Sequence, residues 1–186
     1  MNWTRLGRDA DHPAGIARYM ERGDTLYIWC GGTRNRREWR WNFQTRKLRA
    51  GSGKARVNRK DLLQAQDVFL ALYKAGVKHC DRQVVIGGYS RGYAIALLLA
   101  WMIATYSEVT VLGFAGKRVG NKAFHDQLEE WGVAHCNSSG RWDVVPLLPP
   151  WYAAGKQHWM LFSINPVKAH VYSGHVAAYW RHEVTQ

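Results

Sequence analysis

Residues 83–106 decide the fold, and they read Gln-Val-Val-Ile-Gly-Gly-Tyr-Ser-Arg-Gly-Tyr-Ala-Ile-Ala-Leu-Leu-Leu-Ala-Trp-Met-Ile-Ala-Thr-Tyr. The β-branched run from Val84 to Ile86 predicts a strand, and the apolar run after Gly92 predicts a helix. Between them, residues 88–92 have the pattern Gly-x-Ser-x-Gly. Strand, motif and helix in this order are typical of a nucleophile elbow, a strained turn that exposes a serine hydroxyl at a helix N-terminus. The alternative is a glycine-rich strand-to-helix turn that carries no chemistry.

Strand and helix patterns alternate along the rest of the chain. Strands are predicted at 25–30, 83–87, 109–114 and 133–137, and helices at 58–76, 91–106 and 121–132. This alternation is typical of the α/β class, with a mostly parallel sheet and helices on both faces. We expect one compact domain over residues 1–186, mostly loop with one short helix at 34–57, and irregular chain after Pro146.

Positive charge is concentrated in one segment. The net charge is +12, and residues 34–60 hold eleven Lys or Arg against one acid, Glu38. Such a block implies an anionic partner, either phospholipid head groups or nucleic acid, unless it is only a solvated face. Trp39, Trp41 and Phe43 lie inside the block and suit a membrane interface or a single-stranded nucleic acid equally well.

The sequence also predicts the cellular location and the state of the cysteines. The N-terminus has no apolar leader and no segment has the length of a membrane span, so we expect a cytoplasmic protein, released on lysis if a phage encodes it. Cys30, Cys80 and Cys136 fit neither a disulfide framework nor a zinc site, and we expect reduced, mostly buried thiols. We expect no metal and no cofactor.

A serine nucleophile needs a base and an acid that orients the base. Asp143 is the predicted acid, because it follows the strand predicted at 133–137 and active-site groups gather at the carboxyl edge of a parallel sheet. His175 is the predicted base, since Gly174 and a helix-like run place it in a turn. His170, in an alternating run, is the next candidate, and the base could also be His158 or His182.

Several segments resemble the class 3 lipases, a branch of the α/β-hydrolases. Their order along the chain also matches that family over roughly residues 25–180. The family's Arg-Gly-Thr loop, followed by Trp and Asn, resembles Gly31-Gly32-Thr33 with Trp39 and Asn42, and its Gly-His-Ser-Leu-Gly-Gly elbow resembles residues 88–93. The family's Gly-x-Pro-Arg-Val-Gly-Asn-x-x-Phe segment resembles residues 113–124, and its Asp-x-Val-Pro-x-Leu-Pro-Pro segment matches residues 143–150. Two later histidine segments of the family resemble His158 and the stretch from His175 to Trp180.

The resemblance implies roles for individual residues. Ser90 would be the nucleophile, Asp143 the orienting acid and His175 the general base. The backbone N–H groups of Thr33 and Arg91 would form the oxyanion hole. A lid-like segment would cover about residues 34–49, with interface residues Arg36, Arg37, Trp39, Arg40, Trp41 and Phe43.

The elbow departs from the family pattern at three positions. Tyr89, Arg91 and Tyr93 replace His, Leu and the second Gly. We expect Tyr93 to crowd the packing of helix on strand and Arg91 to place a cation at the oxyanion loop. The segment before the first long helix also lacks the family's His-x-Gly-Phe.

The predicted function is a serine carboxylester hydrolase, a lipase or esterase that cleaves lipid or other acyl esters through an acyl-enzyme on Ser90. The alternative is a non-catalytic module that binds nucleic acid or anionic membrane through residues 34–60. Candidate residues for a triad occur in the order Ser, Asp, His that α/β-hydrolases have, so we favour a hydrolase over a nucleic-acid-binding module. An esterase acting on carbohydrate esters would share the mechanism and differ in its pocket.

Overall fold

The structure is a computed structural model, and it describes residues 3–6, 17–33, 46–51, 53–148, 156–160 and 164–183. The lid and interface predictions fall mainly on residues 34–45, outside the described residues, and stay predictions. They concern Arg36, Arg37, Trp39, Arg40, Trp41 and Phe43.

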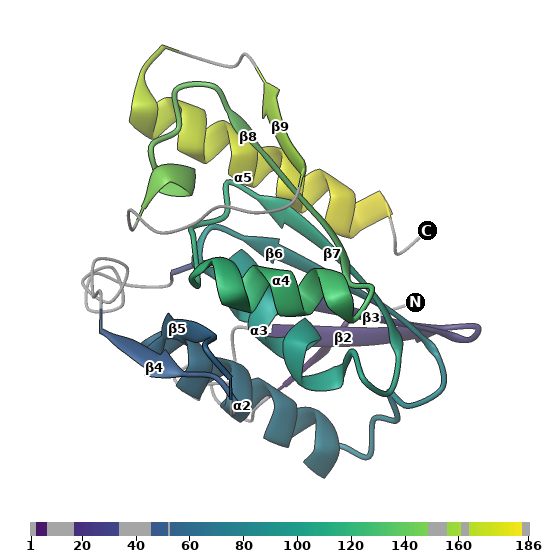
Figure 1. Cartoon of the computed structure of the whole chain (residues 1–186). Helices are drawn as coiled ribbons and strands as arrows, with labels where there is room; N and C mark the ends of the chain where they lie inside the picture. Colours follow the sequence, from purple (N-terminus) through teal and green to yellow (C-terminus); the bar gives the residue numbers. More distant parts are fainter. Residues whose placement is uncertain are drawn as a thin grey trace.

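A mixed sheet forms the centre of the described structure (Figure 1). Its strands run in the order β1-β2-β3-β6-β7-β8-β9. The bounds are β1 (Thr4–Arg5), β2 (Ala17–Arg22), β3 (Thr25–Cys30), β6 (Gln83–Tyr89), β7 (Glu108–Phe114), β8 (Ala134–Gly140) and β9 (Lys156–Met160). From β3 to β9 every pairing is parallel, whereas β1, β2 and β3 pair antiparallel. The predicted mostly parallel sheet is confirmed.

Within the described residues, four α-helices flank the sheet. They are α2 (Arg59–Lys74), α3 (Arg91–Ile103), α4 (Lys122–Glu130) and α5 (Pro166–Glu183). The side chain of Asn58 accepts hydrogen bonds at the start of α2, and that of Asn121 does so at the start of α4, as expected of N-cap residues. Within the described residues, no helix combines the length and the apolar character that a membrane span requires.

The hydrophobic core has two layers because strand side chains alternate between faces. Ile28, Ile86 and Val111 are fully buried on the face that packs against α3. The other face carries a smaller cluster around Trp29 under α5. Glycine at position 87 leaves space for the two tryptophan rings of this cluster. A Cβ at that position would lie 2.5 Å from the ring of Trp180 and 2.6 Å from that of Trp29.

The structure differs from the sequence-based expectation at several segments. Residues predicted as loop form a two-stranded antiparallel sheet, β4 (Lys47–Arg49) with β5 (Arg56–Asn58). The chain after Pro146 is more regular than expected, because it contains β9 and the 18-residue α5. Of the three free thiols, Cys30 is buried but Cys80 is exposed, so burial was predicted correctly only in part.

Candidate active site

Ser90 lies in the strained turn that the motif predicts. It stands between β6 and α3 with φ 55° and ψ −120°, a positive φ that side chains other than glycine rarely adopt. Its backbone N–H donates to the Phe114 carbonyl at 2.8 Å, which ties the turn to β7. The serine is 6% exposed at the N-terminus of α3. This geometry is that of a nucleophile elbow and excludes an ordinary strand-to-helix turn.

Glycine at position 92 allows the elbow to sit against the end of β3. A Cβ on Gly92 would lie 2.1 Å from the Cys30 carbonyl oxygen and 2.5 Å from that of Gly31. No side chain fits in that space, so the backbones of α3 and of the loop after β3 come into direct contact.

Asp143 is buried just beyond the carboxyl end of β8. Its exposure is 1%, and its backbone N–H donates to the Gly140 carbonyl at 2.9 Å. Its Oδ1 accepts a hydrogen bond from the Val145 N–H at 2.9 Å, and its Oδ2 lies 2.9 Å from His170 Nδ1. The acid therefore holds the histidine with one oxygen while the backbone holds the other.

His170 is the histidine that the structure brings to this acid. In a neutral imidazole that donates from Nδ1 to this carboxylate, Nε2 is the acceptor, which is the tautomer that a general base requires. His170 lies in the second turn of α5, and its side chain is 16% exposed. The His170 side chain is thus partly exposed to solvent, whereas the Asp143 side chain is buried.

The prediction of His175 as the base is corrected by this geometry. His170 and His175 lie on the same helix, and five residues at about 100° each turn the helix by about 140°. His175 is exposed. His158 is also exposed, on β9.

His170 ranks second in the sequence-based prediction because the helix was expected only after Gly174, whereas α5 begins at Pro166. Asn165 accepts from the backbone N–H groups of Val167 and Lys168, at 3.0 and 3.1 Å, and Pro166 begins the helix. An Asn followed by Pro is a helix-start signal that the sequence offered. Gly174 looked like a turn, yet it lies inside α5, where a Cβ would come within 3.0 Å of the Tyr89 ring.

Tyr89 connects the elbow to α5. Its hydroxyl donates to the His170 carbonyl at 3.1 Å, and its ring stacks on the His170 imidazole. Burial, followed by the negative charge of Asp143, raises the pKa of Tyr89 to about 12, so the phenol stays a donor at neutral pH. The residue that replaces the family's histidine therefore holds the candidate base.

The loop after β3 reaches the elbow where an oxyanion hole would form. A Cβ on Gly32 would lie 3.5 Å from Ser90 Cβ, so this loop passes directly beside the serine. Thr33 follows Gly32, and Arg91 begins α3 at the positive end of the helix dipole. Thr33 and Arg91 thus lie on the two segments next to Ser90, and their role as oxyanion donors stays a prediction.

Comparison with known proteins decides the family. The model of the family described as Lipase (class 3) matches residues 27–153. The chain belongs to the class 3 lipases. This family match does not favour the nucleic-acid-binding alternative.

Curated relatives of this class 3 lipase come from plants. Phospholipase A1 EG1, chloroplastic/mitochondrial, from Oryza sativa subsp. indica is 35% identical over 96 residues, which are 49% of this chain and 22% of that protein. Phospholipase A1-Igamma2, chloroplastic, from Arabidopsis thaliana is 37% identical over 79 residues, which are 37% of this chain and 15% of that protein. The match thus spans less than a quarter of either relative. Both relatives are named as organellar proteins, so the expectation of a cytoplasmic or phage-encoded protein was wrong.

Solved structures of fungal lipases share the fold. Lipase II from Rhizopus niveus superposes with a TM-score of 0.64 at 20% identity, covering 83% of this chain and 63% of that one. The triacylglyceride lipase of Rhizomucor miehei gives a TM-score of 0.64 at 22% identity, covering 78% of this chain and 62% of that one. These likenesses establish the α/β-hydrolase fold of this class 3 lipase.

Tyr93, which replaces the family's second elbow glycine, is accommodated by glycines elsewhere. Cβ atoms on Gly113 and Gly116 would lie 2.5 and 2.1 Å from its ring. Its hydroxyl lies 3.3 Å from His135 Nδ1, and burial raises its pKa above the usual range of tyrosine. The expected crowding is thus relieved by residues on β7 and just after it.

Arg91 directs its side chain inward, not into the oxyanion loop as expected. Its Nε lies 2.9 Å from Oδ1 of Asp61 in the first turn of α2. Lys117 Nζ lies 2.7 Å from the other oxygen of the same carboxylate. Asp61 is 0% exposed, and each cation is 2% exposed. Two cations and one carboxylate therefore share a buried site behind the elbow.

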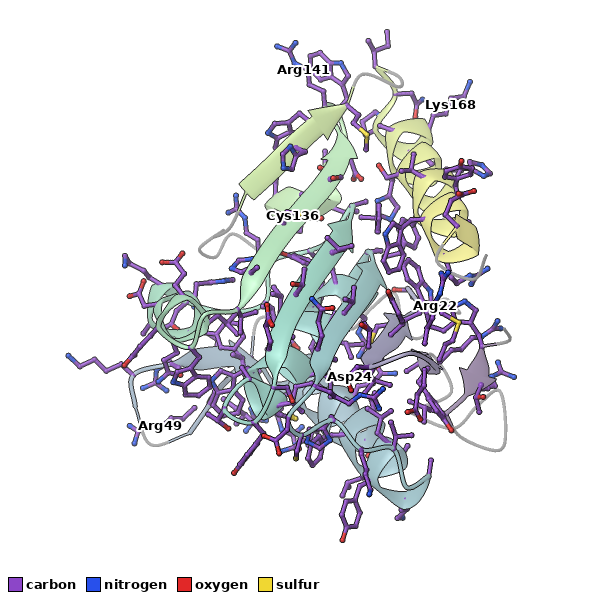
Figure 2. All side chains as sticks on the ribbon, turned by 90° about the vertical axis from the view of Figure 1, so that its right-hand side faces the viewer. Arg22, Asp24, Arg49, Cys136, Arg141 and Lys168 are labelled. Carbon is purple, nitrogen blue, oxygen red and sulfur yellow. The ribbon has the colours of Figure 1, made fainter. Side chains whose placement is uncertain are left out.

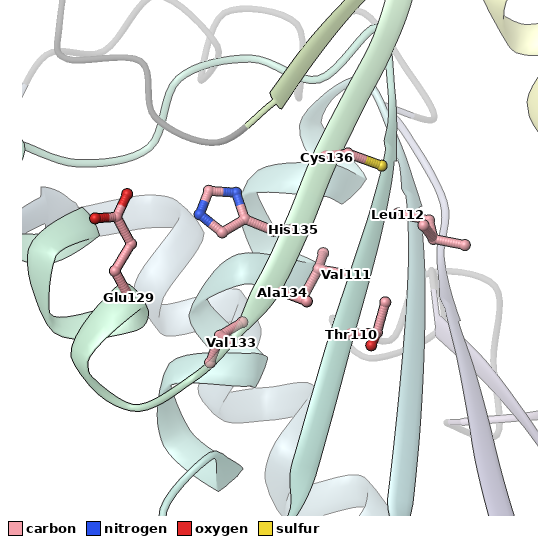
Figure 3. Close-up of a pocket in the computed structure, with 8 residues that line it drawn as sticks. All are labelled: Thr110, Val111, Leu112, Glu129, Val133, Ala134, His135 and Cys136. Carbon is pink, nitrogen blue, oxygen red and sulfur yellow. The ribbon is translucent and has the colours of Figure 1, made fainter.

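The structure also contains a pocket of about 570 Å³. Figure 3 shows its lining residues, which are Thr110, Val111, Leu112, Glu129, Val133, Ala134, His135 and Cys136. They belong to β7, to β8 with the residue before it, and to α4, whereas Ser90 and Asp143 follow the carboxyl ends of their strands. The pocket is thus separate from the candidate active site.

Proposed function

We propose that the chain is a serine hydrolase that cleaves carboxylic esters of lipids. The observation that carries the proposal is the contact between His170 Nδ1 and Asp143 Oδ2, 2.9 Å long, in a chain whose elbow serine has a strained backbone. A hydroxyl, an oriented imidazole and a buried carboxylate are the three groups that acyl transfer needs. Family membership supports the same chemistry.

The proposed reaction assigns each proton transfer to a named residue. Ser90 Oγ attacks the ester carbonyl while His170 Nε2 takes its proton, and Asp143 stabilises the imidazolium that forms. The backbone N–H groups of Thr33 and Arg91 donate to the oxyanion, and such donors contribute about 3 kcal/mol each. His170 then returns the proton to the leaving alcohol, and a water molecule releases the acid by the same steps.

Phospholipid and glycerolipid esters are the substrate classes that we propose. The plant relatives are named as phospholipases A1, and a fungal structure is described as a triacylglyceride lipase. Apolar side chains around the acid and base support a lipid-facing rim. Trp142, Val144, Leu147, Val167 and Val171 are each about half exposed or more.

An anionic membrane surface is the partner that we propose for the basic segment. Arg46, Lys47, Arg49, Lys54 and Arg56 are exposed on and beside the β4–β5 hairpin. Figure 2 shows Arg49 extending from this side of the molecule, far from Lys168 on α5. Each such cation near an anionic surface contributes about 1 kcal/mol. Together with the lid-like residues 34–45, this hairpin would bring the enzyme to its substrate.

Two measurements test these proposals. Purified wild type should hydrolyse p-nitrophenyl esters and phospholipid in mixed vesicles, and Ser90→Ala should lose at least about a thousandfold in kcat. Turnover that persists in Ser90→Ala would refute the serine mechanism. Phosphatidylglycerol vesicles should bind the protein in low salt and release it in high salt. Equal binding to phosphatidylcholine vesicles would refute the membrane proposal without affecting the catalytic one.

A further inference from the structure

The buried cluster of Asp61, Arg91 and Lys117 carries more positive than negative charge. Its single carboxylate meets Arg91 Nε at 2.9 Å and Lys117 Nζ at 2.7 Å, so both of its oxygens are engaged. All three residues are 2% exposed or less. Counted by residue type, the cluster holds two basic side chains and one acidic side chain, a formal charge of +1.

Both cationic residues are linked to the nucleophile through the backbone. Arg91 follows Ser90 directly and is the first residue of α3. The backbone N–H of Lys117 donates to the Ser90 carbonyl at 3.4 Å. Both cationic residues therefore contact the turn that holds the nucleophile, and the Arg91 N–H is itself a proposed oxyanion donor.

Stability does not explain the cluster. The N-terminus of a helix is its positive end, where a cation is disfavoured. Buried ion pairs are often replaceable by apolar residues with no loss of stability. The family's elbow pattern has Leu at the position of Arg91. Its Gly-x-Pro-Arg-Val-Gly-Asn pattern has Pro at the position of Lys117, directly before the arginine that corresponds to Arg118. Two positions that are apolar in the pattern are thus cationic in this chain.

We propose that Asp61, Arg91 and Lys117 form a positioning cluster whose excess positive charge stabilises the oxyanion of the tetrahedral intermediate. The inference rests on the proposed hydrolase function. Asp61 holds both cations at the back of the elbow, so the positive charge is fixed before the reaction begins. When the substrate carbonyl becomes an oxyanion, it supplies the second negative charge that the cluster lacks. None of the three side chains touches the substrate; they act through the electric field and through the Arg91 backbone.

Lys117→Met is the decisive variant because it removes the excess charge and keeps the Asp61–Arg91 pair. A unit charge roughly 10 Å from an oxyanion changes a rate by about tenfold at an effective permittivity of about 20. Lys117→Met should therefore lower kcat on a p-nitrophenyl ester about tenfold, with KM changed by less than about twofold. Lys117→Arg should restore most of the rate, since it returns the charge.

Lys122→Met is the matched control. It removes the same unit charge five residues further along, at an exposed ion pair with Asp126. The control should keep the wild-type kcat, which separates the buried charge from a change in net charge.

A p-nitrophenyl phosphonate provides a second readout that does not depend on acyl preference. Ser90 Oγ forms a bond to phosphorus, p-nitrophenolate leaves, and His170 takes the serine proton. Labelling of the wild type but not of Ser90→Ala tests the proposed function, whereas the ratio of labelling rates between wild type and Lys117→Met tests the cluster. We expect about tenfold slower labelling of Lys117→Met.

An apolar triple variant keeps the proposal falsifiable if Lys117→Met fails to fold. Asp61→Leu, Arg91→Leu and Lys117→Met together leave no charged side chain in the cluster, and the variant should melt at or above the wild-type temperature. This variant should still label slowly. Wild-type rates in a folded Lys117→Met or triple variant would overturn the inference and leave the hydrolase standing. A wild type that neither turns over esters nor labels would overturn both.

Discussion

The imidazole of His170 stacks on the phenol ring of Tyr89, with ring centroids 5.2 Å apart and ring planes inclined by 27°. Tyr89 precedes the proposed nucleophile, and its hydroxyl donates to the His170 carbonyl. One side chain therefore sets both the ring and the backbone of the base relative to the elbow. In the family pattern this position is a histidine, so the chain has a different way of placing its base.

Tyr89→Ala should lower kcat by about ten- to a hundredfold, because a base misplaced by about 1 Å transfers protons poorly. Tyr89→Phe keeps the stacked ring and loses only the hydrogen bond, so its kcat should fall by no more than a few fold. Steady-state kinetics on one soluble ester compares the two. Equal losses in both variants would show that the hydrogen bond, and not the stack, positions His170.

His170→Ala and His175→Ala form a matched pair on α5. The first removes the proposed base and should lower kcat at least about a thousandfold. The second removes an exposed side chain and should leave kcat within a few fold. The same ester assay, with circular dichroism to confirm folding, distinguishes them. A larger loss in His175→Ala would restore the original sequence prediction.

Asp61→Asn should destabilise the fold, because it leaves Arg91 and Lys117 buried without their counter-charge. Removing one partner from a buried ion pair typically costs about 3–5 kcal/mol. Asp126→Asn breaks an exposed pair and should cost about 1 kcal/mol or less. Urea unfolding measures both. A loss in Asp61→Asn no greater than that of the surface variant would mean that water reaches the cluster.

Acid should destabilise the protein through His125. Burial, then the neighbouring His135, lowers the pKa of His125 to about 4 against the opposing effect of Asp126. The unfolded chain keeps the ordinary value near 6.5, so it binds the proton first as the pH falls. The free energy of unfolding should fall between pH 6.5 and 4 by up to about 3 kcal/mol, and this contribution levels off below pH 4.

Unfolding by urea at pH 7.5 and pH 5 measures the effect. His125→Leu should show a smaller difference between the two pH values than wild type, whatever its absolute stability. His158→Gln alters an exposed histidine and should keep the wild-type difference. If His125→Leu kept it too, the acid sensitivity would arise elsewhere.

Local patterns predicted the elements whose signals lie within a few residues. Ser90 and Asp143 were found this way, because a nucleophile elbow and a loop after a strand are short-range features. The choice between His170 and His175 depended on which side of α5 faces Asp143, and that is set by long-range packing. Ser173 illustrates it: its hydroxyl donates to the Ala169 carbonyl and accepts from the Gly140 N–H, each at 3.0 Å, which joins α5 to the end of β8.

The buried cluster could not be predicted for a similar reason. Asp61 lies on α2, Arg91 on α3 and Lys117 in the loop between β7 and α4. Each alone has the pattern of an ordinary charged residue. Arg91 was expected at the oxyanion loop because it follows the serine. The carboxylate that draws it inward is 30 residues away in the sequence.

The position of α5 at the far end of the described chain has a consequence for the order in which the protein is made. A ribosome that has synthesised the chain as far as β9 has already produced Ser90, yet His170, the proposed acceptor of its proton, has not been added. A polypeptide interrupted before Pro166 would carry an inert alcohol, so unfinished copies should spare the lipids around them.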